Sequence, residues 1–135
     1  MYLDQYGMVQ FGNGGGGGGG SSAKGRKITA LTASSGVVTV PADEKSVYTY
    51  TVASGDTIGV ESPAQDTMPV SWLLLTIPSV APAFSFATGI IWPNSAGIFA
   101  STNPAPTFTG NYEYLLTFVK DGNDTLCNVA YSKAL

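Results

Sequence analysis

Histidine is absent from this 135-residue sequence, and cysteine occurs only once, as Cys127. Histidine is the commonest general base and a common metal ligand, so its absence argues against serine hydrolase, zinc and redox-metal sites. A lone cysteine forms no disulfide within its own chain, and the surrounding segment TLCNVAY (125–131) is typical of a strand. We therefore expect a protein that is not an enzyme, with no catalytic residues, no metal site and no cofactor.

Charged side chains are also scarce, at 11% of residues, where soluble proteins have about 25%. Residues 1–27 hold three cations and one acid, a net charge of +2, whereas residues 28–135 hold three cations and eight acids, a net charge of −5. This acidic body lacks a broad basic face, which argues against nucleic-acid binding. The small cationic cluster near residue 27 either docks on an acidic neighbour or serves solubility.

Long apolar runs are missing as well. No run approaches the length of about 18 residues that a membrane-spanning helix requires. The first segment, MYLDQYGMVQFG (1–12), lacks the basic and apolar regions of a signal peptide. We expect no insertion into a membrane and synthesis in a cytoplasm.

Glycine, in contrast, is abundant, with seven consecutive glycines at residues 14–20. Such a run is either a flexible tether or a segment where only a bare backbone fits. Because aromatic and apolar residues precede it, we interpret residues 1–27 as an extended arm that anchors residues 28–135, a folded domain; a terminus without a partner is the alternative. The arm residues predicted to bind a partner are Tyr2, Leu3, Tyr6, Met8, Val9, Phe11, Lys24, Arg26 and Lys27.

After residue 27 the chain alternates with the two-residue period of strands and contains no convincing helix. Strands are expected at 28–33, 37–40, 47–53, 57–61, 71–77, 84–92, 114–120 and 125–131. The dipeptide Asp121-Gly122 predicts a hairpin between the last two. Eight short strands at this spacing predict an all-β fold, an antiparallel β-sandwich of jelly-roll or Greek-key type.

Two groups of side chains are candidates for catalysis or ligand binding. Five carboxylates could converge as the acids of a glycoside hydrolase, although solvated loop positions are the simpler interpretation: Asp43, Glu44, Asp56, Glu61 and Asp66. The aromatic residues of the domain are expected mainly in the core, and an exposed one would stack on sugars: Trp72, Phe84, Phe86, Trp92, Phe99, Phe108, Tyr112, Tyr114 and Phe118.

The C-terminal part contains a series of motifs that resembles a known family. An apolar strand ends in Trp-Pro (TGIIWP, 88–93), a Gly/Asn/Pro-rich loop follows, then a Pro-Thr-Phe step, an aromatic strand ending in Asp-Gly, and a last strand. The positions that carry the pattern are Trp92, Pro93, Pro106, Thr107, Phe108, Tyr114, Phe118, Asp121, Gly122, Asn128 and Tyr131. This pattern resembles the C-terminal β-sandwich of tailed-bacteriophage virion proteins, including tail-fibre, head-fibre and receptor-binding components, over residues 37–135.

The resemblance implies a structural component of a virion, made in a bacterial cytoplasm and bound to other capsid or tail proteins. It also implies a homotrimer, as in the fibre members of the family. Our leading hypothesis is therefore a head fibre, capsid decoration protein or small tail component. A carbohydrate-binding adhesin that recognises host surface glycans is the second hypothesis, and a carboxylate-dependent glycan hydrolase is the third.

Overall fold

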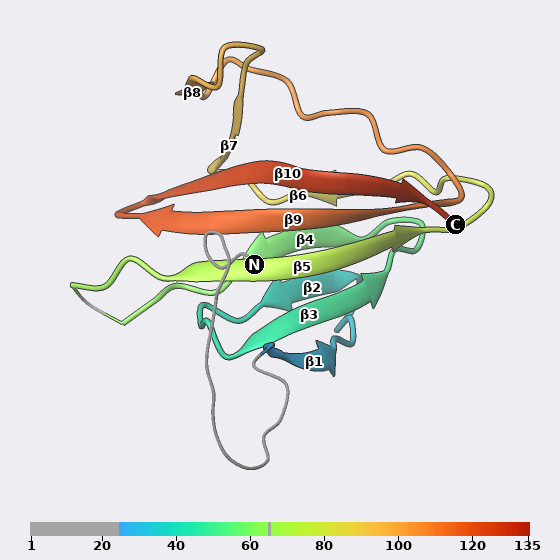
Figure 1. Ribbon diagram of the computed structural model, residues 1–135, viewed down its shortest axis with the longest axis horizontal. Coiled ribbons are helices and arrows are strands. Elements are labelled where there is room, and N and C mark those ends of the chain that lie inside the picture. Colours follow the sequence, from blue (N-terminus) through green and yellow to red (C-terminus); the bar gives the residue numbers. More distant parts are fainter. Residues whose placement is uncertain (1–24, 65) are drawn as a thin grey trace.

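In the computed structural model, which describes residues 25–64 and 66–135, all regular secondary structure is β, and no helix occurs in these two ranges (Figure 1). The strands are β1 (Lys27–Ala30), β2 (Val37–Val40), β3 (Ser46–Thr51), β4 (Thr57–Val60), β5 (Val70–Ile77), β6 (Ser85–Phe86), β7 (Ile90–Pro93), β8 (Phe99–Ala100), β9 (Tyr112–Asp121) and β10 (Asp124–Ala134). The all-β prediction is confirmed.

The strands form two sheets. One has seven strands in the order β1-β3-β5-β9-β10-β7-β8, and the other has three in the order β2-β4-β6. From β1 to β6 the chain crosses to the other sheet at every step, so consecutive strands never pair with each other. Each strand instead pairs in parallel with the strand two positions along the chain.

The predicted antiparallel pairing is therefore only partly correct. It holds for β5 with β9, β9 with β10 and β7 with β8. It is wrong for the pairs β1–β3, β2–β4, β3–β5, β4–β6 and β7–β10, which are parallel. The physical reason is that alternation specifies which face of a strand is buried and not which strand lies beside it. Connections such as residues 31–45, which join β1 to β3 by way of β2, are long enough for parallel crossovers.

Strand boundaries differ from the prediction mainly around Gly89. The expected strand at 84–92 is two strands, β6 and β7, which belong to different sheets. Gly89 between them has a φ of 89°, a left-handed conformation that interrupts a strand and that glycine adopts without strain. The two-residue strand β8 was not predicted. The last hairpin is confirmed, with Asp121 paired to Asp124 and Gly122 at a φ of 62°.

Side chains from both sheets form one hydrophobic core. Along β5, Leu73, Leu75 and Ile77 are fully buried, and the residues between them are half-buried. Tyr48 and Val52 are buried on one face of β3 and the residues that follow it. The buried members of the core are Val38, Val40, Tyr48, Val52, Ile58, Leu73, Leu75, Ile77, Trp92, Tyr114, Leu116, Phe118 and Cys127.

Candidate functional site

Most of the predicted partner-binding residues lie outside the part of the chain that the structure describes: Tyr2, Leu3, Tyr6, Met8, Val9, Phe11 and Lys24. Arg26 and Lys27 are described, and both are exposed. Lys27 is the first residue of β1.

Arg26 is held on the surface of the seven-stranded sheet. Its guanidinium carbon lies 3.8 Å from the centroid of the Trp72 ring, and its Nε donates a hydrogen bond of 2.9 Å to the Glu44 carbonyl. A cation above an aromatic face is attracted by the ring's negative potential, a contribution of about 0.5–1 kcal/mol at an exposed site. Arg26 is therefore held against β5 and against the loop that precedes β3.

The face that carries Trp72 is apolar and rich in hydroxyl groups. The pairing register places Ile28, Val47, Trp72 and Thr117 in one row across β1, β3, β5 and β9. Side chains that alternate with buried neighbours point away from the core. Those on β3, β5 and β9 are mostly half-buried and uncharged: Val47, Thr49, Trp72, Leu74, Thr76, Leu115, Thr117 and Val119.

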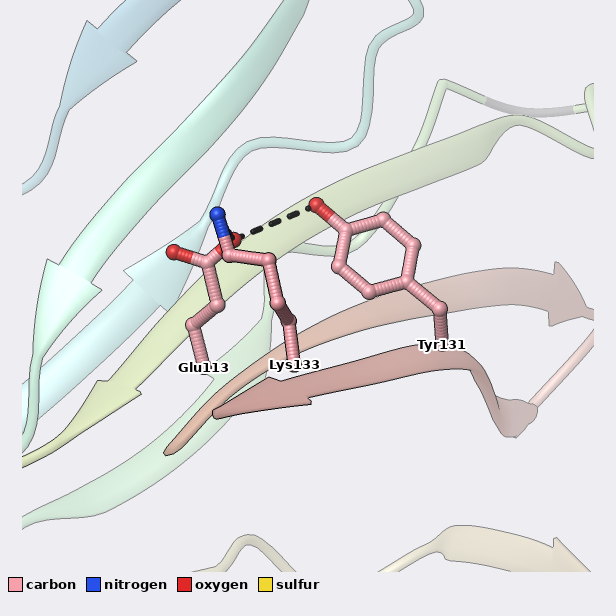
Figure 2. A network of polar contacts seen from close by, with 3 residues as sticks. All are labelled: Glu113, Tyr131 and Lys133. Atoms are coloured by element: carbon pink, nitrogen blue, oxygen red, sulfur yellow. Dashed lines mark hydrogen bonds and ion pairs between the residues drawn. The ribbon is translucent and has the colours of Figure 1, made fainter. Parts of the chain in front are cut away.

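One end of this face carries a small polar network (Figure 2). The Lys133 ammonium lies 3.3 Å from a Glu113 carboxylate oxygen, and the Tyr131 hydroxyl donates to the same oxygen at 3.4 Å. Burial, followed by the nearby Glu113 charge, raises the pKa of Tyr131. Because Lys133 and Tyr131 are exposed, the network contributes little to stability. The opposite charges of Lys133 and Glu113 cancel, so this end of the face carries no net charge.

At the opposite margin of the sheet, β1 is an edge strand (Figure 1). Its central apolar residue, Ile28, is 73% exposed, while Thr29 is half-buried and its hydroxyl lies 3.0 Å from that of Ser46. Among residues 25–64 and 66–135 no strand pairs with the outer side of β1, and an edge of this kind can accept a further strand. Alternation identified a strand here, but nothing in a single sequence marks a strand as an edge.

The five carboxylates considered as catalytic acids have local structural contacts or lie exposed. Asp56, only 4% exposed, accepts hydrogen bonds from the Tyr50 hydroxyl at 2.7 Å and the Ala53 amide at 2.8 Å. Asp43 accepts from the Tyr48 hydroxyl at 2.7 Å, which lowers its pKa. Glu61 accepts from the Ala42 amide at 2.8 Å. Asp43 and Asp56 thus connect loops to β3, and Glu61 connects two loops.

Glu44 and Asp66 complete this set. A Glu44 carboxylate oxygen accepts a long hydrogen bond of 3.4 Å from the Val70 amide, and Asp66 is exposed at a φ of 61°.

Within residues 25–64 and 66–135, no three of His, Cys, Asp and Glu are grouped so that they could hold a metal ion. The same ranges contain no helix long and apolar enough to cross a membrane. Burial raises the pKa of the Cys127 thiol, which lies fully inside the core.

A pocket lined by aromatic residues opens beside β6 and β7. It has a volume of about 560 Å³, and its walls include Phe84, Phe86, Trp92 and Phe108. These rings contact one another mainly at steep angles, as in the pair Phe86–Trp92 with centroids 5.0 Å apart at 77°. The polar side chain of Asn103 also lines the pocket, and its amide nitrogen donates to the Trp92 and Ile98 carbonyls.

The sequence singled out these aromatic residues individually and missed the pocket that they form. Trp92, Phe108 and Tyr114 do meet, with the Phe108 and Tyr114 centroids 4.9 Å apart. Tyr112 lies on Tyr114, at a centroid separation of 6.2 Å, and is not part of the pocket lining. The alternating aromatic residues of the segment FSF (84–86), which includes β6, are the signal that could have indicated the pocket.

No family model, curated protein or solved structure matches this chain.

Proposed function

We propose that this protein is a non-enzymatic structural component of a bacteriophage virion, such as a head fibre, a capsid decoration protein or a small tail component. In this proposal residues 28–135 form a β-sandwich, and residues 1–27 form a glycine-rich arm that anchors it to other virion proteins. The observation that carries the proposal is that residues of the resemblance occupy one packed unit. Trp92, Phe108 and Tyr114 are in contact, and Asp121 and Gly122 close the β9–β10 hairpin.

The surface of the domain supports a role in assembly. The outward face of the seven-stranded sheet is low in charge, and its edge strand β1 starts where the arm joins. Interfaces between protein subunits are depleted of charge at their centres and enriched in Trp, Tyr and Arg. Trp72, Tyr131 and Arg26 all belong to this side of the molecule.

The anchoring mechanism is burial of apolar arm residues in a groove of a virion protein, with the cationic residues Lys24 and Lys27 facing an acidic surface. Arg26 acts differently, because it is already bound to Trp72 and Glu44 of its own domain. We propose that the assembled form is a homotrimer, as in fibre proteins. Light scattering after size exclusion should give three times the mass of one chain.

Incorporation of arm variants into virions tests the proposal. Replacing Tyr2, Leu3 and Tyr6 together by alanine should remove the protein from purified virions, because the anchor loses most of its apolar surface. Replacing Asp4 and Gln5 by alanine is the matched control, and it should leave occupancy close to wild type. Circular dichroism of both variants should be unchanged, since the replaced residues precede β1, which begins at Lys27. Normal occupancy of the triple variant would refute the proposed anchor.

A carbohydrate-binding adhesin is the second candidate, and the aromatic pocket favours it. Half-buried Phe84, Phe86 and Phe108 present rings to a pocket of about 560 Å³, which is large enough for a sugar unit. Glycan-array binding that is lost in Phe84→Ala and retained in Tyr112→Ala would support this function, because Tyr112 lies outside the pocket. A blank array at high protein concentration would refute it.

A further inference from the structure

The aromatic pocket runs along the edge of β6. Six consecutive residues, 82–87, line one wall of it. Consecutive residues of an extended segment point alternately to the two faces of a sheet. A pocket that touches all six therefore follows the edge of the strand and not one of its faces. All residues that line the pocket lie between Pro82 and Phe108, within the described part of the chain.

The backbone groups along this wall point in two directions. The Ser85 and Ala87 amides donate to carbonyls on the β4 side at 2.9 and 2.8 Å. Both backbone groups of a strand residue point to the same edge, and alternate residues point to opposite edges. The amide and carbonyl groups of Phe84 and Phe86 consequently point away from β4. Within residues 25–64 and 66–135 these groups have no hydrogen-bond partner.

The opposite wall of the pocket contains few donors for the two carbonyls. This wall includes Asn103, Ala105, Pro106 and Phe108. Pro106, like Pro104 before it, has no backbone N–H. The side-chain amide of Asn103 already donates to two backbone carbonyls. The pocket thus offers the hydrogen-bonding edge of a strand to a ligand.

We propose that this pocket binds an extended peptide segment of another protein, which adds to β6 as a further strand. In strand addition, main-chain hydrogen bonds supply affinity, and contacts with alternate side chains supply specificity. The backbone groups of Phe84 and Phe86 supply the first of these. Their rings supply the second, because their centroids lie 5.7 Å apart, close to the repeat of about 6.6 Å between alternate residues of a partner strand.

The lining also defines the chemistry of the partner segment. No charged side chain lines the pocket, so a charge on the ligand would lose hydration without gaining a partner. The segment is therefore uncharged, with apolar side chains against the rings and small polar ones between them. A volume of about 560 Å³ holds a few residues of such a segment. A sugar unit fits the same volume but has no repeating amide groups to pair with the strand edge.

This inference goes beyond the proposed function, because it concerns the pocket and depends on neither the arm nor a virion. It is an alternative to the carbohydrate candidate, since both ligands would occupy the same space. The experiment therefore includes a sugar.

Titration of the full-length protein, followed by NMR, tests the proposal. The probe is a seven-residue peptide of alternating serine and leucine, blocked at both ends and added up to millimolar concentration. We expect saturable shifts of the Phe84 and Phe86 amide signals. The Tyr112 amide signal should not shift, because Tyr112 lies outside the pocket.

Two ester analogues of the peptide test strand pairing. One has an ester in place of the amide of every leucine, and the other has an ester in place of the amide of every serine. Alternate N–H groups of a strand point to opposite edges, so only one analogue should bind more weakly. The expected change in its dissociation constant is at least about fivefold, as for the loss of one hydrogen bond.

A matched pair of protein variants tests the location. Ala105→Trp places a large ring in the pocket and should abolish the peptide-induced shifts. Thr107→Trp is the control, because Thr107 is exposed in the same loop and does not line the pocket, and it should bind the peptide as wild type does. The ester comparison uses the unchanged protein, so it is independent of whether a variant folds.

Each other outcome overturns the proposal. Absence of saturable shifts at millimolar peptide means that no strand is added. Equal binding of the two ester analogues means that the rings hold the peptide without strand pairing. Retained binding in Ala105→Trp places the peptide outside the pocket. Shifts caused by maltotriose and not by the peptide assign the pocket to carbohydrate.

Discussion

The hydrogen bond between Tyr50 and Asp56 provides a sharp test of how the strands and loops of this domain are held together. The Tyr50 hydroxyl donates to an Asp56 carboxylate oxygen at 2.7 Å, and the same oxygen accepts from the Ala53 amide at 2.8 Å. Asp56 is only 4% exposed and immediately precedes β4. The bond thus ties β3, in the seven-stranded sheet, to the start of a strand in the other sheet.

Tyr50→Phe removes this bond and leaves the ring in place. A hydrogen bond to a charged group contributes about 1.5–3 kcal/mol, and the half-buried position of Tyr50 favours the lower value. We therefore expect the free energy of unfolding to fall by about 1.5 kcal/mol, which lowers the melting temperature by about 6 °C for a domain of this size. Chemical denaturation followed by circular dichroism measures the first value, and calorimetry measures the second.

The pH dependence adds a second signature. The hydrogen bond to Asp56, together with burial and the Asp56 charge, raises the pKa of Tyr50 from 10 to about 12. A group with a raised pKa in the folded state binds its proton more tightly there, so its stabilisation is complete below pH 10 and is lost as the pH rises to 12. Wild type should consequently lose more stability than Tyr50→Phe between pH 10 and pH 12. Tyr48, whose pKa is also raised, titrates in both proteins and does not affect the difference.

Tyr131→Phe is the matched control for this experiment. The Tyr131 hydroxyl makes a 3.4 Å contact with Glu113 on a side chain that is 43% exposed, so its removal should change the free energy of unfolding by less than about 0.5 kcal/mol. If Tyr50→Phe and Tyr131→Phe are equally stable, or if the wild-type curve above pH 10 matches that of Tyr50→Phe, the reasoning about Asp56 is wrong.

Three further predictions follow from packing. Gly110→Ala should destabilise by about 1–3 kcal/mol in denaturant titrations, because a Cβ there would lie 2.5 Å from the Ser79 carbonyl oxygen, whereas Gly25→Ala, with no atom within 4 Å, should not. Phe118→Ala should cost about 3–5 kcal/mol in the same titration, since this side chain is fully buried, and a loss below 1 kcal/mol would contradict the assigned core. The Cys127 thiol, buried and with a raised pKa, should react with Ellman's reagent only after unfolding; rapid reaction of the native protein would refute its burial.

Period-two alternation was sufficient to predict that most of these segments are strands. It did not identify the buried face of β5, because Trp72 and Leu74 on the half-buried face are as apolar as Leu73 and Leu75 on the buried face. The final hairpin was predictable, because Asp121-Gly122 specifies its turn through short-range geometry.

Strand order was not predictable, because it depends on contacts between residues distant in sequence. The inward side chains of β2 and β3 enter the same core, yet these strands belong to different sheets, so their hydrophobic patterns are indistinguishable. The aromatic pocket was not predictable for the same reason. The ring centroids of Phe86 and Phe108 lie 5.6 Å apart because residues 94–107 bring Phe108 back beside β6. No local pattern in the sequence predicts the path of these residues.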